Sequence, residues 1–507
     1  MKPTARPQAP TDRASDASHV ARSGVLQLLS ALGQGLMPVT HIMIARLFGP
    51  AVFGAYQASL AILEVLTRAG LVGSMHGMHR FIPAHRAEGD TELEQRALGT
   101  GIRLTVAVSS LLALALALLA PWVARAWNEP ALAASLPLMA PAVLLATTTL
   151  VLIAATMGAK VARMSLYVRG LAEPILLLLA VLLAARLGGG TLRSLVVGHV
   201  ASSLVVAACA VTACARVFGA TYLRRALGAG RHPGFVRFAM PLGASDVLGA
   251  VLNRADTFIV ASFAGLDALA LYSAAEFITR VIANPRYLFD HIIAPVVAEA
   301  LHMKDRARVR YNLALVTRWV ITACAPIAVT IIVLRAEILG LYGASFAAGT
   351  GPVVILAIHH LIVGCLGLTP YVVSMGGRSR LLMINNLCAA VLNIGLGLIL
   401  VPRFGTTGAA ISVLVSVASF QVAMTIEAWI LERVHPFTPA QLKPVAAALA
   451  ALAIETGVHR LVGAGPARVI GVIGAGAAAY VAVLVVLGLA PEERDGLRRL
   501  AARLRPG

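Results

Sequence analysis

Apolar segments of about twenty residues recur along almost the whole of this 507-residue chain, separated by turns rich in Gly, Pro and charged residues. A run of that length crosses the bilayer core as one helix, because about 20 residues rising ~1.5 Å each span ~30 Å. Fourteen such runs can be delimited. Lipid offers no hydrogen bonds to an exposed backbone, so the chain is predicted to be an all-α polytopic membrane protein with fourteen transmembrane helices. Its composition agrees, with 59% hydrophobic and 13% charged residues.

The basic residues indicate how the helices are oriented. A net charge of +19 would suggest nucleic acid in a soluble chain, but most of the 42 Lys and Arg fall in alternate loops and in both tails. Cytoplasmic loops carry such an excess, so both termini are expected in the cytoplasm and no nucleic acid is expected to bind. The first apolar run is too long and too Gly-broken for a signal peptide. We therefore expect a multi-pass membrane protein that retains this first span.

The distribution of loops predicts two six-helix lobes followed by an extra pair of helices whose role the sequence leaves open. The predicted parts are a disordered cytoplasmic N-terminus at 1–22, an N-lobe with helices 1–6 at 23–215, a basic cytoplasmic linker at 216–236, a C-lobe with helices 7–12 at 237–431, helices 13 and 14 at 432–490, and a basic cytoplasmic tail at 491–507. The basic stretches 216–237 and 304–318 could lie along anionic lipid, although a role as topology signals alone is favoured.

A short motif occurs once in each predicted lobe. In the N-lobe, the turn at Gly49-Pro50 is followed by Tyr56 and then by Glu64 and Arg68. In the C-lobe, Gly265 precedes Tyr272 by the same seven residues, and Glu276 and Arg280 follow. An internal repeat that places charges inside apolar helices is typical of a transporter.

These residues also carry a family resemblance. The segment Ala45-Arg-Leu-Phe-Gly-Pro with Phe53-Gly-Ala-Tyr56, the segment Leu400-Val-Pro-Arg-Phe-Gly-Thr-Thr-Gly408, and Asp256 with Gly265 and Tyr272 resemble polysaccharide transporters. That family contains lipid-linked oligosaccharide (O-antigen) flippases of the multidrug/oligosaccharidyl-lipid/polysaccharide exporter superfamily. The resemblance implies two pseudo-symmetric lobes, as in multidrug exporters of this fold, around a central cavity with alternating access.

Charged residues within the predicted spans mark the expected site. A charge near mid-membrane costs about 3 kcal/mol, so such residues usually face a cavity or a partner. Arginine suits a diphosphate because its planar fork donates two parallel hydrogen bonds. The residues predicted to bind the diphosphate and glycan are Arg46, Arg68, Asn253, Arg254 and Arg280. The candidates for coupling to H+ or Na+ are Glu64, Asp256 and Glu276.

A plainer alternative is that each charged pair neutralises itself. Glu64 with Arg68, and Glu276 with Arg280, are four residues apart and share a helix face. Arg254 and Asp256 are two apart and point in different directions, so at least one is expected to reach another helix or a ligand.

Other residues favour structural roles. His359 and His360 could relay protons, but ordinary packing is the favoured interpretation. The five cysteines lie within spans and indicate packing, and His76, His79 and His85 lack the spacing of a metal site. No nucleotide-binding or catalytic motif is present, so we expect neither an enzyme nor a bound cofactor or metal.

The predicted function is that of a flippase. By alternating access it would move a polyprenyl-diphosphate-linked oligosaccharide from the cytoplasmic to the outer leaflet of a bacterial inner (plasma) membrane. The product would serve lipopolysaccharide O-antigen or exopolysaccharide synthesis, with membrane lipids and the polymerase or export machinery of the pathway as expected partners. A multidrug (organic cation) antiporter of the same fold, a peptidoglycan-precursor flippase and a non-transporting scaffold remain alternatives. The three intramembrane arginines and the 5% aromatic content favour an anionic cargo over a cation.

Overall fold

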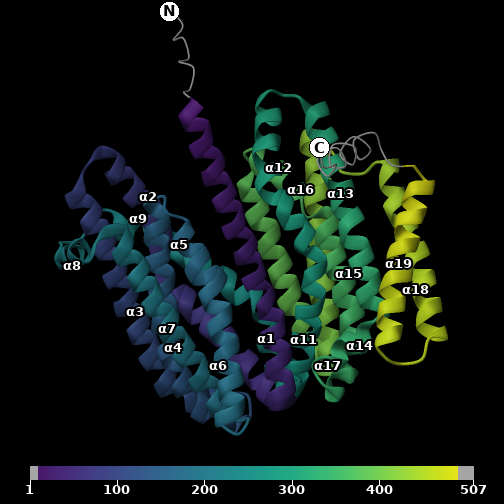
Figure 1. Cartoon of the computed structure of the whole chain (residues 1–507), viewed down its shortest axis with the longest axis horizontal. Coiled ribbons are helices and arrows are strands. Elements are labelled where there is room, and N and C mark those ends of the chain that lie inside the picture. The colour runs from purple at the N-terminus through teal and green to yellow at the C-terminus, as the bar shows by residue number, and fades with distance from the viewer. Residues whose placement is uncertain (1–9, 489–507) are drawn as a thin grey trace, which may run out of the picture. The chain divides into compact units, whose positions relative to one another are not determined.

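A computed structural model of the chain describes residues 10–488 (Figure 1). For some of these residues it describes the backbone alone, namely 10–34, 288, 290–292, 348 and 379. Within the described range every regular element is a helix. The all-α prediction is therefore confirmed. The chain divides into two compact units, residues 1–254 and 255–507.

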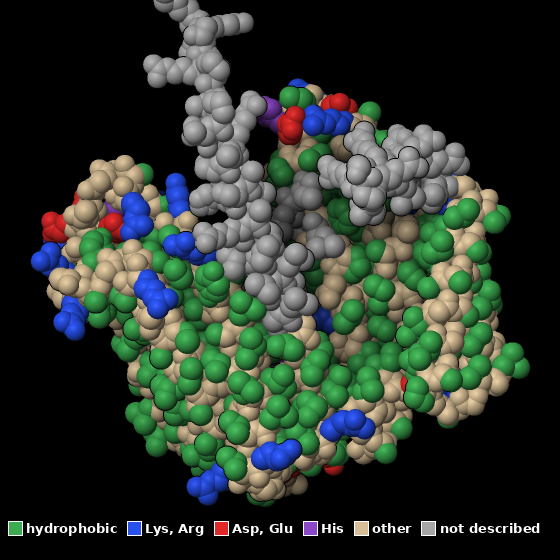
Figure 2. All heavy atoms as spheres, viewed as in Figure 1, with side chains coloured by type: hydrophobic (Ala, Val, Ile, Leu, Met, Phe, Trp, Pro, Cys, Tyr) green, Lys and Arg blue, Asp and Glu red, His purple; other side chains and the backbone are tan. Residues whose placement is uncertain are grey.

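Unit 1 contains ten helical elements. They are α1 (Pro10–Leu71), α2 (Ser74–Glu88), α3 (Thr91–Ala126), α4 (Pro130–Gly158), α5 (Arg163–Ser165), the π-helix η1 (Leu166–Ala172), α6 (Glu173–Leu187), α7 (Leu192–Phe218), α8 (Ala220–Gly228) and α9 (Phe235–Asn253). On the face shown in Figure 2, hydrophobic side chains cover the flank of this unit, and Lys and Arg gather at its two ends. Leu111 and Leu118 on α3 are more than 60% exposed, as expected of side chains that face lipid.

Unit 2 contains the remaining elements. They are α10 (Ala255–Phe263), α11 (Gly265–Arg280), η2 (Val281–Ala283), α12 (Asn284–His302), α13 (Arg306–Val333), α14 (Arg335–Gly340), η3 (Ala344–Gly349), α15 (Thr350–Leu366), α16 (Thr369–Met375), α17 (Ser379–Glu432), η4 (Pro439–Gln441), α18 (Leu442–Leu461) and α19 (Pro466–Val486). The last two helices pack on α13 through Ala451, Val472 and Tyr480. On α18, Glu455 is 1% exposed and accepts a hydrogen bond of 3.0 Å from the Thr330 hydroxyl.

Within residues 10–488, ten helices are long and apolar enough to cross a membrane, or eleven if the bent pair α15 and α16 forms one span. Two of these exceed one crossing, because the stretches 35–88 and 380–432 are 54 and 53 residues long. Each contains a glycine with non-helical backbone angles, Gly49 (φ 81°) and Gly405 (φ 56°). The predicted turn at Gly49-Pro50 is thus confirmed, whereas the total of fourteen spans stays a prediction.

The division between the units follows α9 and does not fall in the predicted linker 216–236. The helix belongs to unit 1 because its backbone lies directly against the start of α2. A Cβ atom at Gly73 would come within 2.0 Å of the Ala239 carbonyl oxygen, and one at Gly243 within 2.4 Å of the Gly73 nitrogen. Only glycines at both positions permit this approach. The seventh predicted span, 237–263, is accordingly interrupted at Arg254, where α9 ends and α10 begins.

The N-terminal tail also differs from expectation. Residues 10–22, part of the segment 1–22 that was predicted to be disordered, belong to helix α1. The Ala and Arg residues of this stretch are good helix formers, so the membrane helix can extend through this polar sequence. Residues 1–9 and the predicted basic tail 491–507 lie outside the described range.

Candidate functional site

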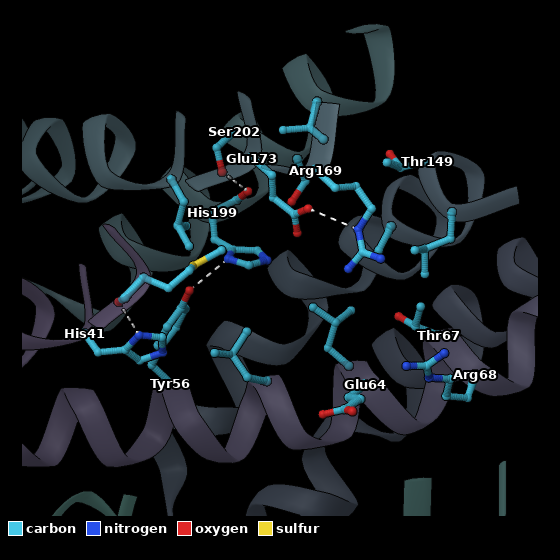
Figure 3. A pocket seen from close by; sticks show the side chains of 18 of the residues that line it. His41, Tyr56, Glu64, Thr67, Arg68, Thr149, Arg169, Glu173, His199 and Ser202 are labelled. Atoms are coloured by element: carbon cyan, nitrogen blue, oxygen red, sulfur yellow. Dashed lines mark hydrogen bonds and ion pairs between the residues drawn. The ribbon is translucent and has the colours of Figure 1, made fainter. Parts of the chain in front are cut away.

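A pocket of about 360 Å³ lies within unit 1, between α1, α4, η1, α6, α7 and the end of α9 (Figure 3). Hydroxyl and imidazole groups line it together with five charged side chains. The charged residues are Glu64, Arg68, Arg169, Glu173 and Arg254. Three guanidinium groups against two carboxylates leave the lining with an excess of one positive charge when its histidines are neutral. An open pocket with charged side chains of this kind, inside a membrane-spanning unit, is a candidate ligand site.

The central ion pair of the pocket joins two distant parts of the unit. The Arg254 Nε donates to Glu64 Oε2 at 2.7 Å, and its Nη2 lies 2.5 Å from the same oxygen. Arg254 stands where the seventh predicted span is interrupted, 190 residues after Glu64. The expectation that Arg254 or Asp256 would reach another helix is confirmed. Both side chains of the pair are about one-third exposed, so the pair remains accessible to a ligand.

Arg68 lines the same pocket but does not pair with Glu64. Its partner within α1 would be Glu64, one turn earlier, but that carboxylate binds Arg254 instead. Among the described residues Arg68 makes no side-chain hydrogen bond or ion pair, although it lines the pocket. Self-neutralisation of Glu64 and Arg68 is therefore wrong for this structure. A half-buried guanidinium without a protein acceptor retains its full capacity to bind an anion.

A second charged pair, Arg169 and Glu173, was not among the predicted site residues. The Arg169 Nε lies 3.5 Å from Glu173 Oε2, and Figure 3 shows both on the side of the pocket opposite Arg68. Arg169 belongs to the π-helix η1, and such wide turns inside α-helices occur frequently at functional sites. The available signal was the four-residue spacing of an arginine and a glutamate at the start of an apolar run, as in the repeated motif.

Tyr56 and His199 form the uncharged end of the pocket. The Tyr56 hydroxyl oxygen and His199 Nδ1 share a hydrogen bond of 2.8 Å. Figure 3 shows the second ring nitrogen of His199, Nε2, directed away from Tyr56. His41 is anchored by its Nδ1 to the Met37 carbonyl oxygen at 2.7 Å. The sequence marked Tyr56 as part of the repeat but gave no reason to select His199.

Two of the predicted ligands in unit 1 lie outside this pocket. Arg46 is exposed near the Gly49 turn and does not line this pocket. Asn253 is exposed at the end of α9 and is likewise not part of the lining. Asp246, a further charged residue of α9, lies 3.0 Å from His76 Nε2 on α2.

The predicted residues of unit 2 pair with one another. The Tyr272 hydroxyl donates to Asp256 Oδ2 at 2.6 Å. Arg280 donates to Glu276 Oε1 through Nε at 3.1 Å and Nη2 at 2.5 Å, so this pair does neutralise itself. His359 and His360 are both buried in α15 with ring centroids 4.6 Å apart. Across the described residues, no group of three or more His, Cys, Asp or Glu side chains could hold a metal ion.

A family model described as polysaccharide biosynthesis protein matches residues 43–348, which include every charged residue of the pocket. The chain belongs to this family. None of the curated proteins matches its sequence.

Solved structures give the fold of this polysaccharide biosynthesis protein. It is similar to the lipid II flippase MurJ in an inward closed conformation, with a TM-score of 0.71, 14% identity and coverage of 90% of this chain and 97% of that one. It is also similar to an inward-facing multidrug resistance MATE family transporter of the MOP superfamily, with a TM-score of 0.68, 13% identity and coverage of 80% and 94%. A MOP superfamily transporter from Pyrococcus furiosus has a TM-score of 0.57, 12% identity and coverage of 80% and 94%. The family model thus confirms the predicted family, and the likeness to these solved structures shows that the chain has the same fold.

Proposed function

We propose that this polysaccharide biosynthesis protein is a flippase that moves a polyprenyl-diphosphate-linked oligosaccharide from the cytoplasmic to the outer leaflet of a bacterial inner membrane. The pocket of unit 1 would bind the head group. Arg68 would bind the diphosphate, with Arg169 and Arg254 at its flanks. Glycan hydroxyls would meet the hydroxyl and imidazole groups of Ser202, Ser203 and His199.

The observation that carries this proposal is the unpaired guanidinium of Arg68. Two of the three arginines in the pocket are compensated by Glu64 and Glu173, whereas Arg68 has no acceptor among the described residues. A guanidinium in a site of low dielectric binds phosphate oxygens strongly, because it donates two parallel hydrogen bonds and stays charged at every cellular pH. The diphosphate of a lipid-linked glycan supplies such oxygens.

The same charge balance speaks against the rival from the multidrug class. A site for organic cations needs uncompensated carboxylates or aromatic faces. Here both glutamates of the pocket are engaged by arginines, and Tyr56 is buried with its hydroxyl bound to His199. A peptidoglycan-precursor flippase would need the same arginines, so it remains a second candidate of the same chemical class.

Alternating access would carry the head group across the membrane. An inside-negative potential favours this direction, because each uncompensated negative charge moved outward gains about 2.3 kcal/mol per 100 mV. Glu64, Asp256 and Glu276 remain the proposed sites of coupling to H+ or Na+. Both termini would lie in the cytoplasm, and the polymerase or export machinery of the same pathway would receive the product.

The test compares two arginines of the same helix. Arg68→Gln removes the unpaired guanidinium from the pocket, while Arg46→Gln removes an exposed one outside it. Each variant is reconstituted in vesicles, and transfer of a polyprenyl-diphosphate-linked oligosaccharide is measured. We expect a loss of ten- to a hundredfold for Arg68→Gln, since a charged hydrogen bond contributes about 1.5–3 kcal/mol. Transfer within about twofold of the parent is expected for Arg46→Gln.

A second measurement separates the classes of substrate. Efflux of an organic cation from the same vesicles should be absent in the parent protein and in both variants. Unchanged glycolipid transfer in Arg68→Gln, at equal protein abundance, would refute the assignment of the pocket. Cation efflux by the parent would favour the multidrug class instead.

A further inference from the structure

A second cavity of unit 1 is apolar and lies on the other side of the wall that η1 and α7 form. This groove of about 610 Å³ runs between Met164, Tyr167 and Val168 on one side and Val205, Cys209 and Arg216 on the other. Tyr167 and Val205 are each 46% exposed, so the groove is open to the surroundings of the unit. An exposed apolar groove in a helix bundle with membrane-spanning helices faces lipid chains.

The groove and the head-group pocket use different faces of the same elements. On η1, Val168 lines the groove and Arg169 lines the pocket. On α7, Val205 lines the groove and Val206 lines the pocket. The two sites are therefore separated by one layer of helix, and a ligand in the groove does not touch the charged residues of the pocket.

One end of the groove is strongly basic. Arg216, in the last turn of α7, forms part of the lining. Arg163 precedes the lining residue Met164, and Lys160 lies in the turn between α4 and α5. All three are exposed, and among the described residues none has a side-chain hydrogen bond or an ion pair. No described acidic residue lines the groove, so its charge is uncompensated.

We propose that this groove binds one anionic glycerophospholipid. An acyl chain would lie against Val168, Val205 and Cys209, and the phosphate would bind Arg216 and Arg163, with Lys160 nearby. Tyr167 has the amphipathic ring that is favoured at the interface between chains and head groups. The three cations favour an anionic lipid. A zwitterionic lipid would place its ammonium group beside these cations, where no carboxylate offsets the repulsion. The basic segment beginning at residue 216 would thus have a lipid ligand as well as a role in orientation.

The experiment titrates purified full-length protein in detergent with phosphatidylglycerol and, separately, with phosphatidylethanolamine, and counts bound lipid by native mass spectrometry. We expect one retained phosphatidylglycerol and no comparable retention of phosphatidylethanolamine. Arg163→Gln and Arg216→Gln should each weaken phosphatidylglycerol binding about fivefold, and the double variant about 25-fold, given the usual attraction of one basic residue to an anionic lipid surface.

Two further variants make the result specific. The double variant Arg186→Gln/Arg193→Gln removes two exposed arginines at the opposite end of α6 and α7 and should leave binding unchanged. Ala208→Phe fills the groove from an exposed position without changing its charge and should also weaken binding. Arg68→Gln should not affect binding, which separates this proposal from the assigned head-group pocket.

Three results would overturn the proposal. Equal losses in the two double variants would indicate a general surface attraction. Equal retention of the two phospholipids would remove the role of the cations. Displacement of phosphatidylglycerol by a lower concentration of a polyprenyl phosphate would assign the groove to the substrate tail.

Discussion

The glutamate of the repeated motif pairs with a distant arginine in unit 1 and with the arginine of its own motif in unit 2. In unit 1, Glu64 binds Arg254 and leaves Arg68 facing a pocket. In unit 2, Glu276 binds Arg280 one turn later on its own helix. The tyrosines differ likewise, because Tyr56 shares a hydrogen bond with a histidine, whereas Tyr272 donates to the carboxylate of Asp256. The difference teaches that the repeat keeps a glutamate and an arginine four residues apart without keeping the way in which they pair.

The largest effect is expected from replacing Arg254, which pairs with Glu64 190 residues earlier in the sequence. Arg254→Gln deletes one cation and leaves Glu64 unpaired beside the proposed diphosphate, so both changes act against binding. We expect glycolipid transfer to fall by about a hundredfold. Arg280→Gln in unit 2 should reduce it by less than about threefold, measured in the same vesicle assay. Partial recovery in the double variant Glu64→Gln/Arg254→Gln would identify repulsion as part of the loss. Equal losses of glycolipid transfer in Arg254→Gln and Arg280→Gln would contradict the difference between the two units.

Removing the carboxylates should have a smaller effect of opposite sign. Glu64→Gln frees Arg254 inside the pocket, and an added uncompensated cation should tighten binding of a polyprenyl diphosphate about fivefold. The matched change Glu276→Gln removes the carboxylate that Arg280 binds outside this pocket and should leave binding in the pocket unchanged. Equilibrium binding of the diphosphate to each purified variant distinguishes the two. Weaker binding in Glu64→Gln would mean that Glu64 itself contacts the ligand.

The two tyrosines should differ in their contribution to stability. Tyr272→Phe removes a donor from the Asp256 carboxylate and should lower stability by about 1–2 kcal/mol, as expected for a hydrogen bond to a charged acceptor. Tyr56→Phe removes a bond between neutral groups, for which about 0.5–1 kcal/mol is expected within a membrane. Thermal unfolding in detergent gives the comparison. A larger decrease for Tyr56→Phe would contradict it.

Acidification should affect the units in different pH ranges, with the smallest expected effect. In unit 1, burial, His85 and Arg96 lower the pKa of His232, whose Nε2 is 2.8 Å from His85 Nε2. The unfolded chain therefore takes up this proton more readily, and unit 1 should lose stability as the pH falls below about 6.5. In unit 2, burial raises the pKa of Glu337, but hydrogen bonds from backbone N–H, Arg468 and His459 outweigh it and leave the pKa lowered. The stability from Glu337 should persist above pH 4.5 and disappear as the pH falls through its folded pKa.

Hydrogen exchange at pH 7.5, 6.0 and 5.0 tests this order. The amides at the start of α9, close to His232, should lose protection between pH 7.5 and 6.0. The amides of α14 should keep their protection at pH 6.0. His232→Gln should remove the pH dependence in unit 1. Simultaneous loss in both regions would show that these two groups do not control the acid response.

Much of the site was predictable from polar residues in apolar runs. Glu64, Arg68 and Arg254 were selected because burial of charge in a membrane needs a reason, and all three line the pocket. Arg169 and Glu173 were missed because they lie at the start of a span, where charge is expected at the interface. His199 was missed because a single histidine in a helix carries no signal until its partner, 143 residues away, is known. Arg46 was selected from the same reasoning but lies outside the pocket, because α1 ends its first segment at Gly49.

The sequence by itself determined that this protein is helical and spans a membrane, because runs of apolar residues act locally and need no partner. It also determined the turns at Gly49 and near Gly405, since glycine and proline restrict the backbone where they stand. The tertiary structure alone decided which carboxylate neutralises which arginine. Glu64 had a candidate four residues away and paired with one 190 residues away, because helix packing brings Arg254 within hydrogen-bonding distance. That choice leaves Arg68 available for an anion.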